Sequence, residues 1–147
     1  MMMMSAPLTS HIAVIITTVS LFGGSAVTAY DDTLVSIVCN GHTFRDADPW
    51  YDMPSVITDY MVSHTPENVG TVATGYVVYI KEVGIPQVPL YGGGYCSGAI
   101  WPEDCSGCMN SAKSQLFKEC GYHRYGAQVH LKDCDLRYEF YKISDVK

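Results

Sequence analysis

Charged residues are missing from the beginning of this sequence. Residues 1–29 contain no Lys, Arg, Asp or Glu, and the stretch 12–22 is largely apolar. An apolar stretch followed by small residues is typical of a secretory signal peptide. We predict cleavage after Ala29 or a few residues earlier, which leaves residues 30–147 as the mature chain. The alternative, a membrane anchor, is disfavoured because spanning a bilayer takes about 20 apolar residues and this run is shorter.

Basic residues are scarce as well. The chain has 9 Lys and Arg against 15 Asp and Glu, for a net charge of −6. This balance argues against binding to nucleic acid or to an anionic membrane, since both need a basic patch. Residues 30–147 have the size of one compact domain, and no Asn-x-Ser/Thr acceptor for glycosylation occurs. We expect a single soluble, unglycosylated domain that is secreted into the extracellular space.

The common catalytic motifs are missing too. There is no Gly-x-Ser-x-Gly elbow, and the histidines at 42, 64, 123 and 130 do not have metal-ligand spacing. Four tyrosines could form an aromatic platform for a sugar, but in strands such residues more often pack against one another; they are Tyr76, Tyr79, Tyr91 and Tyr95. We therefore expect neither an enzyme nor a bound metal or cofactor.

Cysteine is the residue whose pattern is most informative. An even set of six in a secreted chain predicts three disulfides, with 15 possible connectivities. The six are Cys39, Cys96, Cys105, Cys108, Cys120 and Cys134. Cys105 and Cys108 would fit half of a zinc site or a redox pair, but no second closely spaced pair exists and all six sulfurs can serve in disulfides.

Hydrophobic periodicity predicts an α+β fold. Alternating or β-branched stretches predict strands at 33–40, 75–83 and 88–96, followed by a hairpin that turns near Asp133 and Cys134. Glycines 92–94 in the third strand indicate a bulge or a close approach of another backbone. The residues between 65 and 74 are predicted to form a loop.

Two helices complete the predicted domain. The first follows Asp52 as a cap, with Pro54 in its first turn, and the second runs from Pro102 to Cys120 and ends at Gly121. We expect both helices on one face of a roughly five-stranded antiparallel sheet. In the terminal hairpin, the predicted turn places Gln128 opposite Glu139 on the polar face.

Several of these features together resemble one plant family. They are the Ser-Ile-Val-Cys-Asn segment at 36–40, the spacing Cys96-x8-Cys105-x2-Cys108, Cys120, and the segment 126–139 with its Asp-Cys-x-x-x-Tyr-Glu ending. This pattern resembles the ginkbilobin-homologous domain of cysteine-rich repeat secretory proteins. The resemblance covers nearly all of residues 30–147, and it implies secretion into the plant apoplast. It implies the pairs Cys39–Cys120, Cys96–Cys105 and Cys108–Cys134.

The resemblance also implies a function. Ginkbilobin-type proteins are antifungal, mannose-binding lectins of plant defence, whose sugar contacts come from an Asn, an Arg and a Glu. Carried onto this chain, Asn40 and Glu139 match, while Gln128 occupies the position of the Arg. On the same polar face, Arg137 and His130 are candidates to replace the missing guanidinium. The expected partner is a mannose-type glycan of the fungal cell wall or, alternatively, an extracellular protein, since related domains occur in receptor ectodomains.

Overall fold

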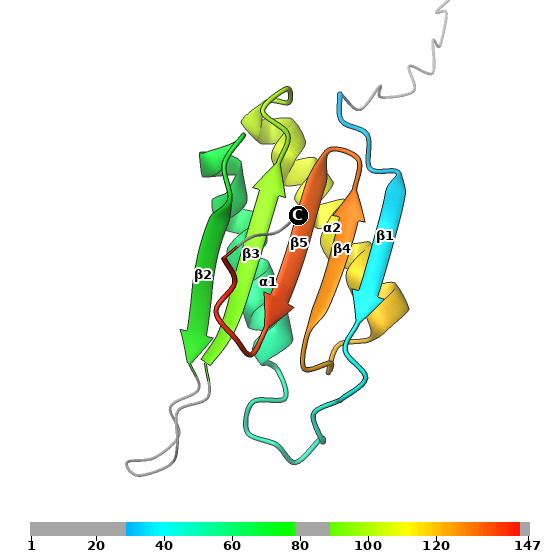
Figure 1. Ribbon diagram of the computed structural model, residues 1–147, viewed down its shortest axis with the longest axis vertical. Helices are drawn as coiled ribbons and strands as arrows, with labels where there is room; N and C mark the ends of the chain where they lie inside the picture. Colours follow the sequence, from blue (N-terminus) through cyan, green and yellow to red (C-terminus); the bar gives the residue numbers. More distant parts are fainter. Residues whose placement is uncertain (1–28, 79–88, 145–147) are drawn as a thin grey trace, which may run out of the picture.

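A computed structural model describes residues 29–78 and 89–144 of the protein as a five-stranded sheet with two helices (Figure 1). All paired strands are antiparallel, in the order β1-β4-β5-β3-β2. The strands are β1 (Leu34–Cys39), β2 (Ala73–Val78), β3 (Pro89–Cys96), β4 (Ala127–Leu131) and β5 (Cys134–Glu139), and the helices are α1 (Met53–His64), the short 3-10 helix η1 (Thr65–Asn68) and α2 (Pro102–Cys120). The predicted signal peptide lies outside the described residues except for Ala29.

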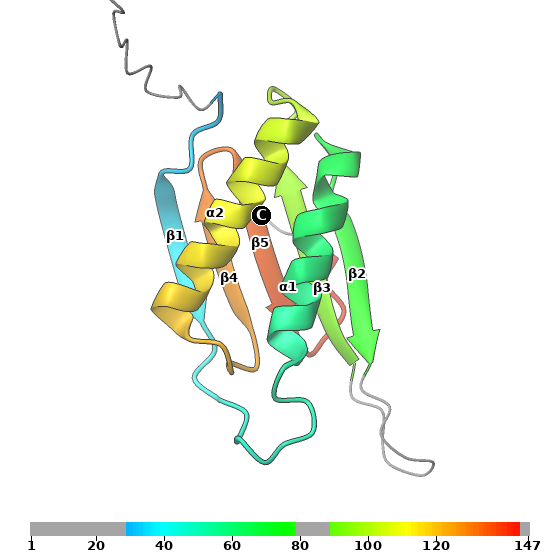
Figure 2. The same ribbon diagram turned by 180° about the vertical axis from the view of Figure 1, so that it is seen from behind.

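The molecule has two layers. Both helices cover one face of the sheet (Figure 2), and the other face carries no helix, although the segment that follows β5 crosses it in front of β3 (Figure 1). The hydrophobic core lies between the two layers, where Ile57 of α1 and Leu116 of α2 meet Leu136 of the sheet. The predicted α+β architecture is confirmed. We call the uncovered side the open face.

The first helix begins where the sequence predicts, but without the predicted side-chain cap. Asp52 occupies the cap position, yet its carboxylate makes no capping hydrogen bond. Instead its backbone carbonyl accepts hydrogen bonds from the amides of Ser55, at 3.1 Å, and Val56, at 3.2 Å. The predicted loop after α1 is partly wrong, because the chain continues as η1 and β2 begins at Ala73. The end of the predicted second strand, beyond Val78, lies outside the described residues.

Close packing of the helical layer against β3 explains two of its three glycines. A Cβ atom built on Gly92 would lie 2.6 Å from Cγ1 of Ile57, and one built on Gly94 would collide with the hydroxyl of Thr65. β3 keeps an unbroken register with both of its neighbours, β2 and β5. The predicted bulge is not found, and the close approach to β3 is made by side chains and not by another backbone. The glycines let α1 and η1 lie directly on the strand.

Three disulfides fasten α2 to the sheet. They join Cys39 of β1 to Cys120, Cys96 of β3 to Cys105, and Cys108 to Cys134 of β5. This is the pairing that the family resemblance implies. Every cysteine is in a disulfide, so the thiolates that a zinc site or a redox pair needs are already used. Since each bridge holds a different strand, α2 fixes the positions of β1, β3 and β5 relative to one another.

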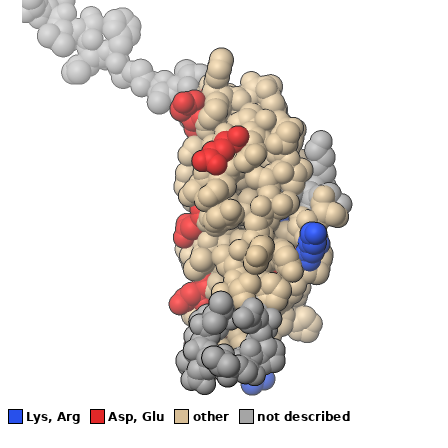
Figure 3. Space-filling view, turned by 90° about the vertical axis from the view of Figure 1, so that its left-hand side faces the viewer, with Lys and Arg blue, Asp and Glu red and all other residues tan. Residues whose placement is uncertain are grey.

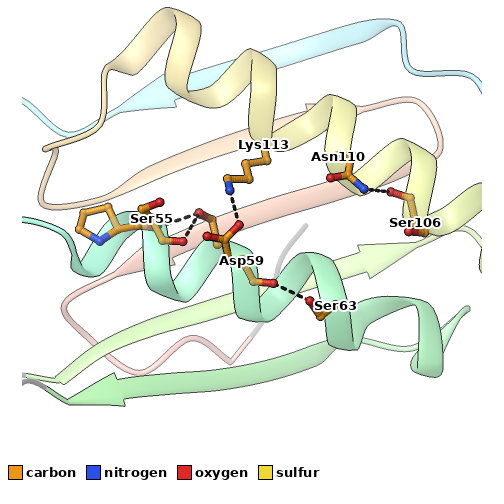
Figure 4. A network of polar contacts seen from close by, with 8 residues as sticks. Ser55, Asp59, Ser63, Ser106, Asn110 and Lys113 are labelled. Atoms are coloured by element: carbon orange, nitrogen blue, oxygen red, sulfur yellow. Dashed lines mark hydrogen bonds and ion pairs between the residues drawn. The ribbon is translucent and has the colours of Figure 1, made fainter.

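Polar contacts join the two helices on the side facing solvent. Lys113 of α2 forms an ion pair with Asp59 of α1, and Ser63 donates a hydrogen bond to the Asp59 carbonyl at 3.0 Å (Figure 4). Seen from the β2 edge, acidic side chains gather along the helical side of the molecule, while a basic side chain stands on the opposite side (Figure 3). On this edge of the molecule, the acidic side chains therefore lie on the helical layer (Figure 3). Within the described ranges, no helix is long and apolar enough to cross a bilayer.

Candidate functional site

The open face of the sheet carries three rows of side chains. Alternate residues of a strand point to the same face, and successive rows lie about 6.8 Å apart along it. From β1 to β3, the first row is Asn40, Gly126, Glu139 and Tyr91, the second is Val38, Gln128, Arg137 and Gly93, and the third is Ser36, His130, Asp135 and Tyr95. The predicted site residues Asn40, Gln128 and Glu139 thus fall in two neighbouring rows.

The register of the terminal hairpin differs from the predicted one. Gln128 lies opposite Arg137 and not opposite Glu139, and His130 lies opposite Asp135. The difference arises because the turn lies at Lys132 and Asp133, one residue earlier than predicted, and moving a turn by one residue shifts every cross-strand pair by two residues. A shift of two residues leaves every side chain on its predicted face, whereas a shift of one would have turned all of them inward.

Glu139 is held in a confined position at the end of β5. Its carboxylate lies against Gly126, where any Cβ atom would collide with it, and Oε1 is 3.7 Å from Nε of Arg137. The Glu139 side chain is only 15% exposed. Burial raises the pKa of Glu139 above its ordinary value, although the charge of Arg137 and hydrogen bonds from Tyr141 and Arg137 oppose the shift. The Glu139 carboxylate is therefore a hydrogen-bond acceptor held in a fixed orientation next to the guanidinium of Arg137.

Arg137 brings a guanidinium group beside Gln128. Its Nη2 donates a hydrogen bond to the hydroxyl of Tyr141 at 2.6 Å, and its guanidinium carbon lies 5.6 Å from the centre of the Tyr141 ring. Tyr141 belongs to the segment that crosses the open face. The second row therefore contains the guanidinium that position 128 lacks, supplied by the neighbouring strand. Of the two predicted substitutes, Arg137 is adjacent to Gln128 across the strands, and His130 lies one row away.

Asn40 is positioned by the end of β1. Its amide donates to the carbonyl of Gly126 at 2.8 Å, which places it beside β4, and its own carbonyl accepts from Nη1 of Arg124 at 3.3 Å. The side-chain Oδ1 accepts a hydrogen bond from the amide of His42 at 2.9 Å. The amide nitrogen of this side chain is consequently the group that Asn40 offers to a ligand.

An aromatic cluster lies next to the strand ends that carry the first row. The rings of Phe44 and Tyr125 lie 4.6 Å apart, and Phe140 packs edge-on against both, at 5.3 Å and 4.8 Å. Phe44 follows β1, Tyr125 precedes β4 and Phe140 follows β5. The cluster therefore holds together the strand ends that carry Asn40 and Glu139. Sequence reasoning missed this cluster, because Phe44 and Tyr125 are isolated aromatics outside the periodic segments.

Two hollows flank these rows. One, of about 500 Å³, is lined by Ser36, Tyr95, Ser97, Gln128, His130, Lys132 and Asp135, and we call it the polar pocket. The other, of about 380 Å³, is lined by Tyr60, Thr74, Gly75, Tyr76, Tyr91, Gly92, Lys142 and Ile143. Of the four tyrosines singled out in the sequence, Tyr76 and Tyr91 line the second hollow, Tyr95 lines the polar pocket, and Tyr79 is outside the described residues.

Comparison with known proteins assigns the family. A family model described as salt stress response/antifungal matches residues 36–141, which run from β1 to the segment beyond β5. The chain belongs to this family. The predicted relationship to the ginkbilobin-homologous domain is confirmed, since several curated relatives in this antifungal family carry ginkbilobin in their names.

The similar proteins are of two kinds. Antifungal protein ginkbilobin-like protein 2 of Picea glauca is 28% identical over 121 residues, covering 81% of this chain and 85% of that protein. Antifungal protein ginkbilobin-2 of Ginkgo biloba is 26% identical over 113 residues, covering 76% of this chain and 78% of that protein. Plasmodesmata-located protein 5 of Arabidopsis thaliana is 25% identical over 140 residues, covering 93% of this chain but 44% of that protein.

A solved structure shows the same fold. The tandem DUF26 ectodomain of the Arabidopsis thaliana cysteine-rich receptor-like protein PDLP8 superposes with a TM-score of 0.63 at 20% identity. The match covers 76% of this chain and 51% of that structure, so this chain spans about half of the tandem ectodomain. Family membership and three disulfides agree with an extracellular module, because disulfides persist in oxidising compartments.

Proposed function

We propose that this protein is a secreted plant defence protein that binds mannose-type glycans of the fungal cell wall. Asn40, Gln128 and Glu139 make the sugar contacts, and Arg137 supplies the guanidinium that position 128 lacks. The observation that carries the proposal is the direct pairing of Gln128 with Arg137, in the row next to Asn40 and Glu139. The antifungal proteins among its relatives support the defence role.

The chemistry of the two rows suits a sugar. Vicinal hydroxyls need partners that donate and accept side by side, and amides provide both, while a carboxylate accepts through two oxygens. Hydrogen bonds to charged groups are roughly twice as strong as those between neutral groups. Glu139 and Arg137 are charged and fixed by each other, so they lose little conformational freedom when a ligand binds. The amides of Asn40 and Gln128 lie beside them and add neutral contacts.

Replacing Glu139 by alanine is expected to abolish sugar binding. Loss of a charged hydrogen-bond partner costs about 1.5–3 kcal/mol, or about 10- to 100-fold in affinity, which removes detectable binding from a weak lectin. The measurement is calorimetric titration of the secreted, disulfide-bonded protein with mannose and mannan, accompanied by mapping of chemical-shift changes.

The matched control is Glu119→Ala, a carboxylate at the end of α2 on the helical layer. This variant should bind as the wild type does. Saturable binding with shifts at Asn40, Gln128 and Glu139 supports the lectin proposal. Equal affinity of wild type and Glu139→Ala would refute the site, and no response at high millimolar sugar would refute the function.

Sugar binding is also expected to weaken as the pH falls. Burial raises the pKa of Glu139 above the ordinary 4.5, so its carboxylate takes up a proton at a higher pH than an exposed glutamate does. The protonated group is a poorer acceptor for sugar hydroxyls, and affinity should therefore fall through a midpoint above 4.5. Titrations between about pH 4 and pH 8 test this expectation. Glu139→Gln should bind weakly and without this pH dependence; a wild-type affinity that stays constant over the range would contradict it.

The second candidate function is that of a protein-interaction module. β1 is an edge strand with three exposed apolar side chains, Leu34, Val35 and Val38, which are 43%, 54% and 62% exposed. Edge strands of this kind can pair with another chain. Absence of glycan binding, together with retention of a purified extracellular partner that Val38→Lys abolishes, would favour this function over the lectin.

A further inference from the structure

We propose that the glycan site continues along the open face into the polar pocket, so that the ligand is a neutral oligosaccharide of at least two sugar units. This inference rests on the proposed function and adds a second subsite to it. The pocket is built from the third row of the open face together with Ser97 and Lys132. Of its residues, Gln128 belongs to the predicted sugar site and His130 was predicted only as a substitute for the missing guanidinium.

Gln128 connects the two subsites. Its side chain stands in the second row, opposite Arg137, and it also lines the polar pocket. His130, the next residue of β4 on the same face, lies about 6.8 Å further along the strand. A ligand held by Glu139 and Arg137 and extended parallel to β4 therefore enters the pocket. Its volume of about 500 Å³ lies in the range typical of small-molecule sites, about 300–1,000 Å³, and a single sugar at the first two rows leaves it unfilled.

A buried ion-pair partner orients the polar groups of the pocket. Asp135 is only 3% exposed although it lies on the open face, and its carboxylate contacts Nδ1 of His130. With Nδ1 directed at this carboxylate, the other ring nitrogen of His130 is left for a ligand hydroxyl. Ser36 lies directly opposite His130 on β1, and Tyr95 lies opposite Asp135 on β3. The pocket thus offers hydroxyl, imidazole and amide groups that donate and accept.

The charges in the pocket favour a neutral ligand. Nζ of Lys132 lies 3.0 Å from Oδ2 of Asp31, and His130 faces Asp135, so each basic group has an acidic partner. Hydrogen bonds from Thr33, followed by contact with Lys132, lower the pKa of Asp31 to about 2, which keeps Asp31 ionised as the partner of Lys132. An anionic sugar would have to displace one of these carboxylates. A neutral sugar needs only hydrogen bonds, which the side chains of the pocket can make in both directions.

The test compares one sugar unit with several. We expect the wild-type protein to bind mannotriose about tenfold more tightly than methyl mannoside, because two or three additional neutral hydrogen bonds form. Ser36→Tyr, which fills the pocket from an exposed position on β1, should lose this tenfold preference while keeping its affinity for methyl mannoside. His130→Gln, which keeps a donor for Asp135, should lose part of the preference. Thermal melting of both variants checks that they are folded.

Each outcome decides between the two proposals. Chemical shifts at Ser36 and His130 that move with mannotriose but not with methyl mannoside would support the second subsite. Equal affinity of the wild type for both sugars would overturn the subsite and leave the lectin function intact. A preference that persists in Ser36→Tyr would place the additional units elsewhere and also overturn it. If neither sugar binds, the proposed function fails and the subsite fails with it.

Discussion

Replacing Cys39 and Cys120 together by alanine is expected to lower the free energy of unfolding by about 4.5 kcal/mol in the loop-entropy model. Their disulfide closes the longest loop of the three, with a sequence separation of 81, and it joins the edge strand β1 to the end of α2. Without it the unfolded chain regains the conformational freedom of that loop. A loss of this size is a large part of the 5–15 kcal/mol by which small domains are usually stable. Urea unfolding monitored by circular dichroism measures it.

The matched control is the double replacement of Cys96 and Cys105, which are 9 residues apart. In the loop-entropy model this shorter bridge contributes about 2.6 kcal/mol, clearly less than the long one. Both pairs join a strand to α2, so the comparison isolates loop length. A larger loss for the short bridge would show that packing around the sulfurs, and not the unfolded chain, dominates the stability. The long-bridge variant should also lose sugar binding, because Asn40 follows Cys39 directly.

Gly94→Ala is expected to destabilise the protein by about 3 kcal/mol, the upper end of the usual cost of overpacking. The added methyl group would collide with the hydroxyl of Thr65, which is fully buried and donates a hydrogen bond to the carbonyl of Met61 at 2.7 Å. It would also come within 3.1 Å of Cε of Met109. The strand cannot move away, because it is paired on both sides.

Gly41→Ala serves as the control for this substitution. Gly41 is exposed, and no atom would lie within 4 Å of its added Cβ. Its melting temperature should equal or slightly exceed that of the wild type, since only the freedom of the unfolded chain is reduced. If Gly94→Ala melts at the wild-type temperature, the close approach of η1 to β3 is not what requires glycine at this position.

Hydrophobic periodicity predicted the secondary structure well, because burial on one face imposes it on the sequence. Val129 and Leu131 alternate with polar residues in β4, and Pro102 and Gly121 mark the ends of α2. The errors in the predicted secondary structure occur where tertiary contacts determine the local conformation. A backbone carbonyl of Asp52 replaces its side chain at the start of α1, and η1 forms where Thr65 is buried against β3.

The candidate site was predictable only in part. Alternation along the strands placed Gln128 and Glu139 on one face, and the family resemblance added Asn40. The neighbours of these residues across the sheet were not predictable, because a turn that starts one residue earlier shifts every pair by two residues without changing any face. The pairing of Gln128 with Arg137 and the assembly of the polar pocket around Asp135 both follow from this register.

The sequence by itself determined the two-layer architecture and the polar character of the open face, because each depends on local spacing and on which side chains avoid water, while the pairing of the six cysteines came from the family resemblance. Only the tertiary structure decided which polar groups meet. Cross-strand neighbours come from distant segments, and their pairing depends on the turn after β4 and on the disulfides through which α2 holds β1, β3 and β5. The guanidinium beside Gln128 and the carboxylate behind His130 result from that assembly.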